Sequence, residues 1–371
     1  MNLVARGMSF FPRVCVVSRI AGLREAIEAS AAPSLASITY VDDLEAAGSA
    51  LAECTVLVGE PGVCKPLIAR CPKLEWLQST FAGCNPLLEQ PRRDFVTTRL
   101  AGCFGPDMAE YAALHILRLE RQHEEQQAAA RRCEWNDARD GEGRVHSSSD
   151  YRRLSSLTLG VLGLGDIGSG IARACSLGLR MNVIGCRRDS SPRASDAEAG
   201  VSKVFALSEL AAFLAASDYI VSVLPSTPDT RGLLDGQVLA ACAARSARGV
   251  ALINVGRGDL LSETSILRAV DSGWLSHYVG DVFQVEPLPA SSSLWRHPRV
   301  TVTPHNSAVT APQDVATAFG DNLSRFVGGA PSGPDERFGP GLSGDAAMDP
   351  VGARARGVEA LRNVFNWEAG Y

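Results

Sequence analysis

The chain contains 371 residues, of which 46% are hydrophobic and 21% are charged, and its formal net charge is −5. This composition is typical of a globular protein with two domains. It gives no basic face for nucleic acid, and no stretch approaches the roughly 20 apolar residues that cross a membrane. The ten cysteines show no CxxC or Cys/His ligand spacing, so we expect reduced, mostly buried thiols and no metal site.

The first hundred residues alternate short apolar runs with helix-like segments, which predicts a small open α/β sheet. A long helix is expected next, from residue 106 or 107 to about residue 133, because a proline stands near its start. The polar segment 137–149 predicts a loop. The strands expected in the first sheet are 13–18, 37–41, 55–59, 76–79 and 95–100, and the expected helices are 22–31 and 43–52.

The segment 157–188 organises the rest of the chain. An apolar run at 157–162 predicts a buried parallel strand, and GLGDIG, a helical pattern and a second apolar run at 181–184 follow it. Strand, glycine turn, helix and strand together form the unit that binds a dinucleotide. Further strands are expected at 219–224, 250–255, 279–283 and 300–303, and a helix at 314–327.

Each glycine of GLGDIG has a distinct expected role. Gly163 allows the tight turn, Gly165 lets the backbone approach the pyrophosphate, and Gly168 lets the helix pack closely on the strand. The start of the helix then offers its N–H groups and positive dipole end to the phosphates. An ordinary glycine-rich loop is the alternative, which the strand–turn–helix setting disfavours.

Arg187 and Arg188 follow the second strand of this unit, and they bear on the choice of cofactor. An NAD-binding unit places an acid near this position to hold the ribose 2′-hydroxyl, but here the nearest acid, Asp189, comes after both arginines. Two guanidinium groups suit a 2′-phosphate, and a solvated surface pair is the alternative. We therefore expect NADP(H) to be preferred over NAD(H).

Three polar residues are expected at the carboxyl ends of later strands. Arg257 lies in INVGRG, Glu286 lies in GDVFQVEP, and His305 ends the run VTVTPH. In a doubly wound sheet these ends open on one crevice, where ligands bind. An arginine that holds a carboxylate, a histidine that donates a proton and a carboxylate that orients it suit a keto acid. Each could instead be an ordinary surface or loop residue.

Several motifs resemble the D-isomer-specific 2-hydroxyacid dehydrogenases, and most closely their NADP-using glyoxylate/hydroxypyruvate reductase branch. The resemblance covers nearly the whole chain, and five ordered motifs carry its core. These motifs are GLGDIG, LPSTPDTRGLL, INVGRGDLL, GDVFQVEPL and TPHNSAVT, with LQSTFAGCNPLL and FGPDMAEYAALHIL before them and LRNVFNWEAGY at the chain end.

The resemblance implies two Rossmann-like domains with a cleft between them. Residues 1–103 and 308–371 would form a discontinuous, flavodoxin-like substrate domain, and residues 104–307 a doubly wound NAD(P)-binding domain. Family members are typically homodimers, formed largely through the cofactor domain and its long helix.

The resemblance also implies roles for individual residues. Arg257, Glu286 and His305 would be the catalytic triad, and the backbone N–H groups of Ala82 and Gly83 would bind the substrate carboxylate together with Arg257. Asp281 would hold the nicotinamide carboxamide. The full set of implied cofactor contacts is Met108, Gly163, Gly165, Asp166, Ile167, Gly168, Arg187, Arg188, Leu224, Pro225, Thr230, Val255, Arg257, Asp281 and His305.

Two departures from the family pattern are apparent. Cys84 and Asn85 replace the hydrophobic residue and aspartate that usually follow the substrate loop. About thirty residues, 330–360, intervene before the family-like ending and predict a flexible insertion, because they are rich in Gly, Pro, Ala and Asp. The apolar and aromatic segment 361–371 is expected to dock on the body of the protein.

The predicted function is reduction of a small 2-keto acid, such as glyoxylate or hydroxypyruvate, to the D-2-hydroxy acid by NADPH. A formate dehydrogenase would pair its histidine with glutamine, so Glu286 argues against that activity. Phosphoglycerate oxidation is disfavoured because the sequence shows no extra regulatory domain after the cofactor domain. A dehydrogenase of another 2-hydroxy acid and a cofactor-sensing, corepressor-like protein stay open. A strand-like segment begins at Arg13 and leaves little room for a transit peptide, so we expect the cytoplasm, with organellar targeting as the alternative.

Overall fold

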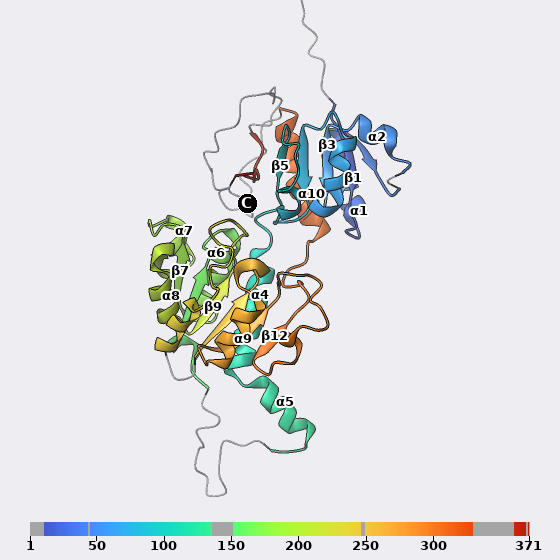
Figure 1. The fold of residues 1–371 in the computed structure, drawn as a ribbon. Helices are drawn as coiled ribbons and strands as arrows, with labels where there is room; N and C mark the ends of the chain where they lie inside the picture. Colours follow the sequence, from blue (N-terminus) through green and yellow to red (C-terminus); the bar gives the residue numbers. More distant parts are fainter. Residues whose placement is uncertain are drawn as a thin grey trace, which may run out of the picture. The chain divides into compact units, whose positions relative to one another are not determined.

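A computed structural model describes residues 11–43, 45–135, 151–245, 249–328, 360–368 and 370. The chain divides into two compact units, Met1–Cys103 with Thr310–Tyr371, and Phe104–Val309. Each unit is built on its own parallel sheet (Figure 1). The second crossing between units lies two residues later than the sequence suggests. The insertion predicted at 330–360 and the loop predicted at 137–149 lie outside the described residues, apart from Ala360.

The first unit holds a five-stranded sheet in the order β2-β1-β3-β4-β5. All neighbouring strands in it are parallel. This order is that of a flavodoxin-like sheet, as expected. The strands are β1 (Arg13–Val17), β2 (Ser37–Tyr40), β3 (Val56–Gly59), β4 (Trp76–Ser79) and β5 (Val96–Thr98).

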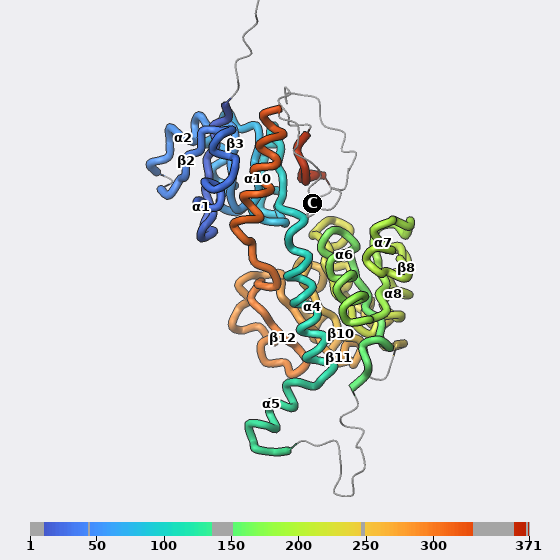
Figure 2. The backbone as a smooth tube through the Cα atoms, turned by 180° about the vertical axis from the view of Figure 1, so that it is seen from behind, coloured from blue at the N-terminus to red at the C-terminus, as the bar shows by residue number. Residues whose placement is uncertain are grey.

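Helix α10 covers one face of this sheet with the apolar stripe that its sequence predicts. Its side chains Phe319 and Phe326 are fully buried, and both rings contact Trp76 of β4, with centroids 5.7 and 5.5 Å away. Helices α1 and α10 lie side by side (Figure 2). The helices of this unit are α1 (Leu23–Glu28), α2 (Gly48–Ala52), α3 (Pro61–Cys64) and α10 (Pro312–Phe326), with 3₁₀ turns at Ala32–Ser34, Lys65–Arg70 and Asn85–Leu87.

The end of the chain docks on the first unit, as its aromatic composition predicts. Val364 forms a bridge with Thr98, and the amide of Phe365 donates to the Thr97 carbonyl at 2.8 Å. The Phe365 side chain is 2% exposed and belongs to the core of this unit. Burial of one aromatic ring contributes about 2 to 3 kcal/mol, which stabilises this docked segment.

The second unit holds a seven-stranded sheet in the order β12-β11-β10-β9-β6-β7-β8, with parallel neighbours. The strand order reverses between β6 and β9, so this is the doubly wound sheet that the sequence predicts. The strands are β6 (Thr158–Leu162), β7 (Asn182–Arg187), β8 (Val201–Ala206), β9 (Tyr219–Ser222), β10 (Val250–Asn254), β11 (Leu275–Gly280) and β12 (Val300–Val302).

The prediction of a single long helix after residue 105 is wrong, because two helices occupy this stretch. Helix α4 ends at Glu120, Gln122 takes a left-handed conformation with φ of 52°, and α5 begins at His123. Figures 1 and 2 both show α5 extending away from the body of its unit. The helices here are α4 (Gly105–Glu120), α5 (His123–Arg131), α6 (Asp166–Arg173), α7 (Ala194–Glu198), α8 (Leu210–Ala216) and α9 (Glu263–Asp271), with shorter turns at Leu154–Ser156, Ala174–Gly178, Leu207–Glu209, Val238–Ala244, Gly258–Leu260 and Ser293–Arg296.

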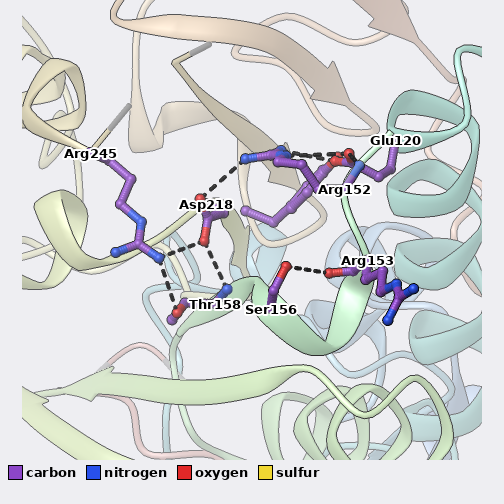
Figure 3. Close-up of polar contacts among 8 residues, drawn as sticks. Glu120, Arg152, Arg153, Ser156, Thr158, Asp218 and Arg245 are labelled. Atoms are coloured by element: carbon purple, nitrogen blue, oxygen red, sulfur yellow. Dashed lines mark hydrogen bonds and ion pairs between the residues drawn. The ribbon is translucent and has the colours of Figure 1, made fainter. Parts of the chain in front are cut away.

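A network of buried charges fixes the end of α4 to the amino end of the sheet (Figure 3). Arg152 lies between Glu120 and Asp218, at 2.8 and 3.2 Å, and Arg245 pairs with Asp218 at 2.7 Å. The Asp218 carboxylate also accepts from the Thr158 amide at the start of β6. Because every buried carboxylate here has an arginine partner, the network is a structural tie.

All ten cysteines are free thiols, and eight are buried, which confirms the prediction that they are mostly buried. Among the described residues, no helix combines the length and the apolar character needed to cross a bilayer.

Candidate active site

The glycine turn lies between β6 and α6, at the edge where the strand order reverses. Gly163 has φ of 106°, a conformation that favours glycine, and its amide donates to the Cys186 carbonyl of β7 at 2.8 Å. Helix α6 begins at Asp166, and no side chain caps this end. The first turn of the helix therefore presents its backbone N–H groups and its positive dipole end at the mouth of the turn.

The other two glycines differ in the space around them. A Cβ atom added to Gly168 would lie 1.9 Å from the Gly163 carbonyl oxygen, so only glycine lets α6 pack against the turn. A Cβ added to Gly165 would meet nothing within 4 Å. The open side of Gly165 and the uncapped helix end fit the pyrophosphate of a dinucleotide, which needs a close backbone approach.

The Arg187 guanidinium is bonded within its own chain in this structure, and its role at a 2′-phosphate stays a prediction. Its side chain is 7% exposed, and it forms a two-pronged ion pair with Asp196 at 2.6 and 2.9 Å. The same guanidinium donates to the carbonyls of Asp189 and Ser191. Four bonds thus use most of its five N–H donors, and Arg187 holds the 189–196 loop together. Arg188, its neighbour, is exposed.

Two of the remaining expected cofactor residues, Thr230 and Val255, are buried. The Thr230 hydroxyl donates to the Pro225 carbonyl at 2.6 Å and accepts from the Thr227 amide, so it shapes its own loop. Val255 is 4% exposed and packs in the core beside the partly buried Met108 of α4. Leu224 contacts the next loop closely, because a Cβ on Gly256 would lie 2.6 Å from the Leu224 carbonyl oxygen.

Arg257 follows β10, on a loop that needs both of its glycines. A Cβ on Gly258 would overlap the Phe283 backbone at 1.9 Å. The Asn254 side chain donates to the Arg257 carbonyl at 3.0 Å and accepts from the Gly256 amide at 3.2 Å. This asparagine shapes the loop, and sequence reasoning missed it because it reads as the last residue of an apolar strand.

Glu286 and His305 meet, although nineteen residues separate them. The Nδ1 atom of His305 lies 2.7 Å from Oε2 of Glu286, and Oε1 of Glu286 accepts from the Phe283 amide at 2.8 Å. The His305 side chain is 54% exposed, so its other nitrogen, Nε2, is accessible to a substrate. His305 follows β12, the direct neighbour of β11.

Neighbouring charges shift the pKa values of this pair in opposite directions. The Glu286 carboxylate raises the pKa of His305 above its ordinary value, while burial and the positive Arg257 guanidinium oppose the rise. Burial alone would raise the pKa of Glu286, but hydrogen bonds from His305 and the Phe283 amide hold it below its usual range. Both shifts favour the charged pair with the proton on the imidazole, which is the form that a proton donor requires.

Asp281 follows β11 and is completely buried. Its carboxylate accepts from the Thr303 hydroxyl at 2.6 Å and from the amides of Asn306 and Ser307 at 3.0 Å each. Burial would raise the pKa of Asp281, but hydrogen bonds from Ser307 and Thr303 hold it below its usual range. In this structure Asp281 binds the segment that carries His305, and its contact with a nicotinamide carboxamide stays a prediction.

Ala82 and Gly83 lie in the first unit, on the loop after β4. Within the part of the chain that the structure describes, neither backbone N–H donates to another residue. Cys84, at the first departure from the family pattern, is 1% exposed and packs in the core of this unit. Two adjacent, unused N–H groups suit an anion such as a carboxylate.

The described residues contain no group of three His, Cys, Asp or Glu side chains arranged to hold a metal ion. The second unit combines a dinucleotide turn with an arginine and a hydrogen-bonded histidine–glutamate pair at adjacent strand ends. This combination defines a nicotinamide-dependent oxidoreductase.

Comparisons with known proteins agree with this class. A family model for the NAD-binding domain of D-isomer-specific 2-hydroxyacid dehydrogenases matches residues 113–307. The glyoxylate/hydroxypyruvate reductase A of Serratia proteamaculans is 32% identical over 277 residues, which are 72% of this chain and 82% of that protein.

Solved structures show the same relation. A D-isomer-specific 2-hydroxyacid dehydrogenase family protein from Aeromonas salmonicida is 36% identical, with a TM-score of 0.72, and covers 86% of this chain and 98% of its own. The NADPH-dependent glyoxylate/hydroxypyruvate reductase of Sinorhizobium meliloti, solved with NADP and sulfate, is 27% identical with a TM-score of 0.74 and covers 98% of this chain and all of its own. This chain belongs to the D-isomer-specific 2-hydroxyacid dehydrogenase family, NAD(P)-dependent oxidoreductases that act on 2-keto and 2-hydroxy acids.

Proposed function

We propose that this enzyme reduces a small 2-keto acid, such as glyoxylate or hydroxypyruvate, to the D-2-hydroxy acid with NADPH. The single observation that carries the proposal is the 2.7 Å contact between His305 and Glu286, in the unit that also holds Arg257. The relatives from Serratia proteamaculans and Sinorhizobium meliloti, which bear the name of this reductase, support the choice of substrate.

His305 is the proton donor in this proposal. Its Nδ1 atom is bound to Glu286, so the proton at Nε2 is the one that passes to the oxygen of the substrate carbonyl. When bound, the reduced nicotinamide supplies the hydride that C2 of the keto acid accepts. Glu286 stabilises the imidazolium before the transfer and keeps the ring oriented during it.

Arg257 is the anion-binding and polarising group. A guanidinium can bind the substrate carboxylate and, through a second N–H, withdraw charge from the carbonyl oxygen on which negative charge develops. The N–H groups of Ala82 and Gly83 are proposed to bind the same carboxylate. We propose that the first unit serves as the substrate domain and that residues 104–307 serve as the NAD(P)-binding domain.

The preference for NADPH is assigned to the exposed Arg188, since Arg187 is committed to Asp196 in this structure. An exposed guanidinium beside the end of β7 can pair with a 2′-phosphate, while Arg187 keeps the surrounding loop in shape. The NADP-bound relative from Sinorhizobium meliloti supports this preference.

A His305→Gln variant tests the proposal. Loss of a general acid should lower kcat by about 10²- to 10⁴-fold while NADPH still binds with nearly unchanged affinity. His297→Gln is the matched control, because His297 also faces a carboxylate, Asp271 at 3.2 Å, away from this pair. Normal turnover by His305→Gln would overturn the assignment. An inactive wild-type enzyme that still binds both cofactors would favour the corepressor-like alternative.

We also propose that the enzyme is a homodimer and acts in the cytoplasm. The exposed Leu114 and Leu117 on α4, together with the projecting α5, support the dimer. Light scattering after gel filtration should give twice the mass of one chain, and a monomer at micromolar concentration would contradict it. Cell fractionation would test the location.

A further inference from the structure

The backbone at His305 takes a conformation that its side chain does not favour. Its φ is 52°, in the left-handed region, where residues other than glycine are uncommon. Such a conformation is energetically unfavourable and persists only where surrounding contacts impose it. The contacts that impose it here come from the residues on either side of His305.

These contacts converge on one carboxylate. Asp281 accepts hydrogen bonds from Thr303, two residues before His305, and from the amides of Asn306 and Ser307, which follow it. A buried anion thus gathers both arms of the turn and leaves the imidazole at its tip. The direction of the His305 ring toward Glu286 depends on this arrangement.

A third residue, from helix α4, completes the chain of hydrogen bonds. The hydroxyl oxygens of Tyr111 and Thr303 lie 2.6 Å apart. The Thr303 hydroxyl has one proton, which it donates to the carboxylate of Asp281, an acceptor only. Tyr111 must therefore donate to Thr303, and the chain runs in one direction, from Tyr111 through Thr303 to Asp281.

Tyr111 is itself held in place as a donor. Its ring packs on His115, with centroids 4.4 Å apart, one turn along α4. Burial raises the pKa of Tyr111 to about 12, so its hydroxyl keeps its proton at neutral pH. Burial also lowers the pKa of His115 to about 4, so the packed imidazole is neutral there.

We propose that Tyr111 and Thr303 are positioning residues, which act through Asp281 to fix the turn that presents His305 to Glu286 and to the substrate. This inference rests on the proposed function, since it assigns the proton-donor role to His305. Neither residue touches the reacting atoms. They tie the catalytic turn to helix α4, and no motif of the sequence indicates this connection.

The test compares Tyr111→Phe, Thr303→Val and Thr303→Ser. The first two remove one hydroxyl each at nearly constant shape, and the third restores the hydroxyl at residue 303. Tyr219→Phe is the matched control, because the Tyr219 hydroxyl also makes one buried hydrogen bond in this unit, at 2.8 Å to Glu120.

In steady-state kinetics, Tyr111→Phe and Thr303→Val should lower kcat by about fivefold, as expected for one lost hydrogen bond. Thr303→Ser should recover most of the activity, and Tyr219→Phe should retain all of it. Equal losses of kcat in Tyr111→Phe and Tyr219→Phe would overturn the proposal.

A second readout needs no substrate. Nuclear magnetic resonance titration of the full chain follows the His305 imidazole, assigned by its loss in His305→Gln. The charged groups acting on this imidazole are Glu286, Asp281 and Arg257. If the turn loosens, the contact with Glu286 weakens, and the pKa of His305 should fall in Tyr111→Phe and Thr303→Val but not in Tyr219→Phe.

An unchanged His305 pKa in both variants would overturn the positioning role, whatever their melting temperatures. A wild-type enzyme without keto-acid reductase activity would instead contradict the proposed function, and the titration would still give its answer. The two failures are therefore distinguishable.

Discussion

Replacing Glu286 with glutamine should move the pH dependence of keto-acid reduction in one direction. The protonated imidazole of His305 is the donor, so activity is lost as the pH rises through its folded-state pKa. The Glu286 carboxylate raises that pKa, and burial and Arg257 lower it. Without the Glu286 carboxylate, burial and Arg257 still lower the pKa of His305, so this pKa falls. The alkaline limb of kcat/KM should therefore move to lower pH.

The size of the effect follows from the contact itself. A hydrogen bond between charged groups contributes about 1.5 to 3 kcal/mol. The side chains of His305 and Glu286 are 54% and 35% exposed, so solvent screens the pair. The lower end of this energy range therefore applies. A loss of about 1.5 kcal/mol corresponds to about a tenfold fall in kcat/KM at neutral pH.

The assay is the pH profile of kcat/KM for Glu286→Gln, measured by NADPH absorbance with glyoxylate. Glu209→Gln is the control, because the Glu209 carboxylate, in the 3₁₀ turn Leu207–Glu209, accepts a backbone amide at 2.8 Å much as Glu286 does. An alkaline limb at the same pH in Glu286→Gln and wild type would refute the role of the carboxylate.

Three further predictions concern the cofactor turn and the buried network. Gly165→Ala should fold with an unchanged melting temperature but bind NADPH at least tenfold more weakly, because its Cβ enters the space proposed for the pyrophosphate. Gly168→Ala should unfold at lower temperature, because its Cβ meets the Gly163 carbonyl oxygen. Equal melting temperatures of the two variants would contradict the different roles of these glycines. Arg188→Ala should weaken NADPH binding about tenfold and leave NADH binding unchanged, and equal losses in calorimetric titration would remove Arg188 from the 2′-phosphate site. Asp218→Ala should destabilise the fold by about 3 kcal/mol in urea unfolding, since it removes the carboxylate partner of Arg245 and of the Thr158 amide and leaves Arg152 paired with Glu120 alone. A change below about 1 kcal/mol would show that solvent already screens the pairs.

The buried strands and the glycine turn could be predicted because local sequence determines them. Strands such as β9 and β10 are largely apolar runs, and they begin where the pattern places them, at Tyr219 and Val250. Strand β8 was not expected, since VSKVFA carries a lysine and is an edge strand with one solvated face. Strand β11 lies earlier than expected, at Leu275–Gly280, because polar residues interrupt its apolar pattern.

The break after α4 depends on tertiary contacts that the helical pattern does not contain. Glu120 is 5% exposed and pairs with Arg152, a residue beyond the following segment, and the left-handed Gln122 then redirects the chain. A run of good helix formers, EEQQAAAR, continues directly afterwards and hides the break.

The site residues divide along the same line. The His305–Glu286 pair could be predicted, because adjacent parallel strands bring their carboxyl ends together. The commitment of Arg187 to Asp196 could not, since it depends on the path of the loop between them. The bonds from Thr303 to Asp281 and from Tyr111 to Thr303 likewise join three segments that no spacing in the sequence connects.

The most direct measurement is the loss of reduced-nicotinamide absorbance with NADPH and then NADH, against glyoxylate, hydroxypyruvate, pyruvate and longer 2-keto acids. Rapid oxidation of NADPH with glyoxylate or hydroxypyruvate, and much slower oxidation of NADH, is the expected result. Binding of both cofactors without oxidation by any of the acids would contradict the assignment of this chain as a 2-keto acid reductase.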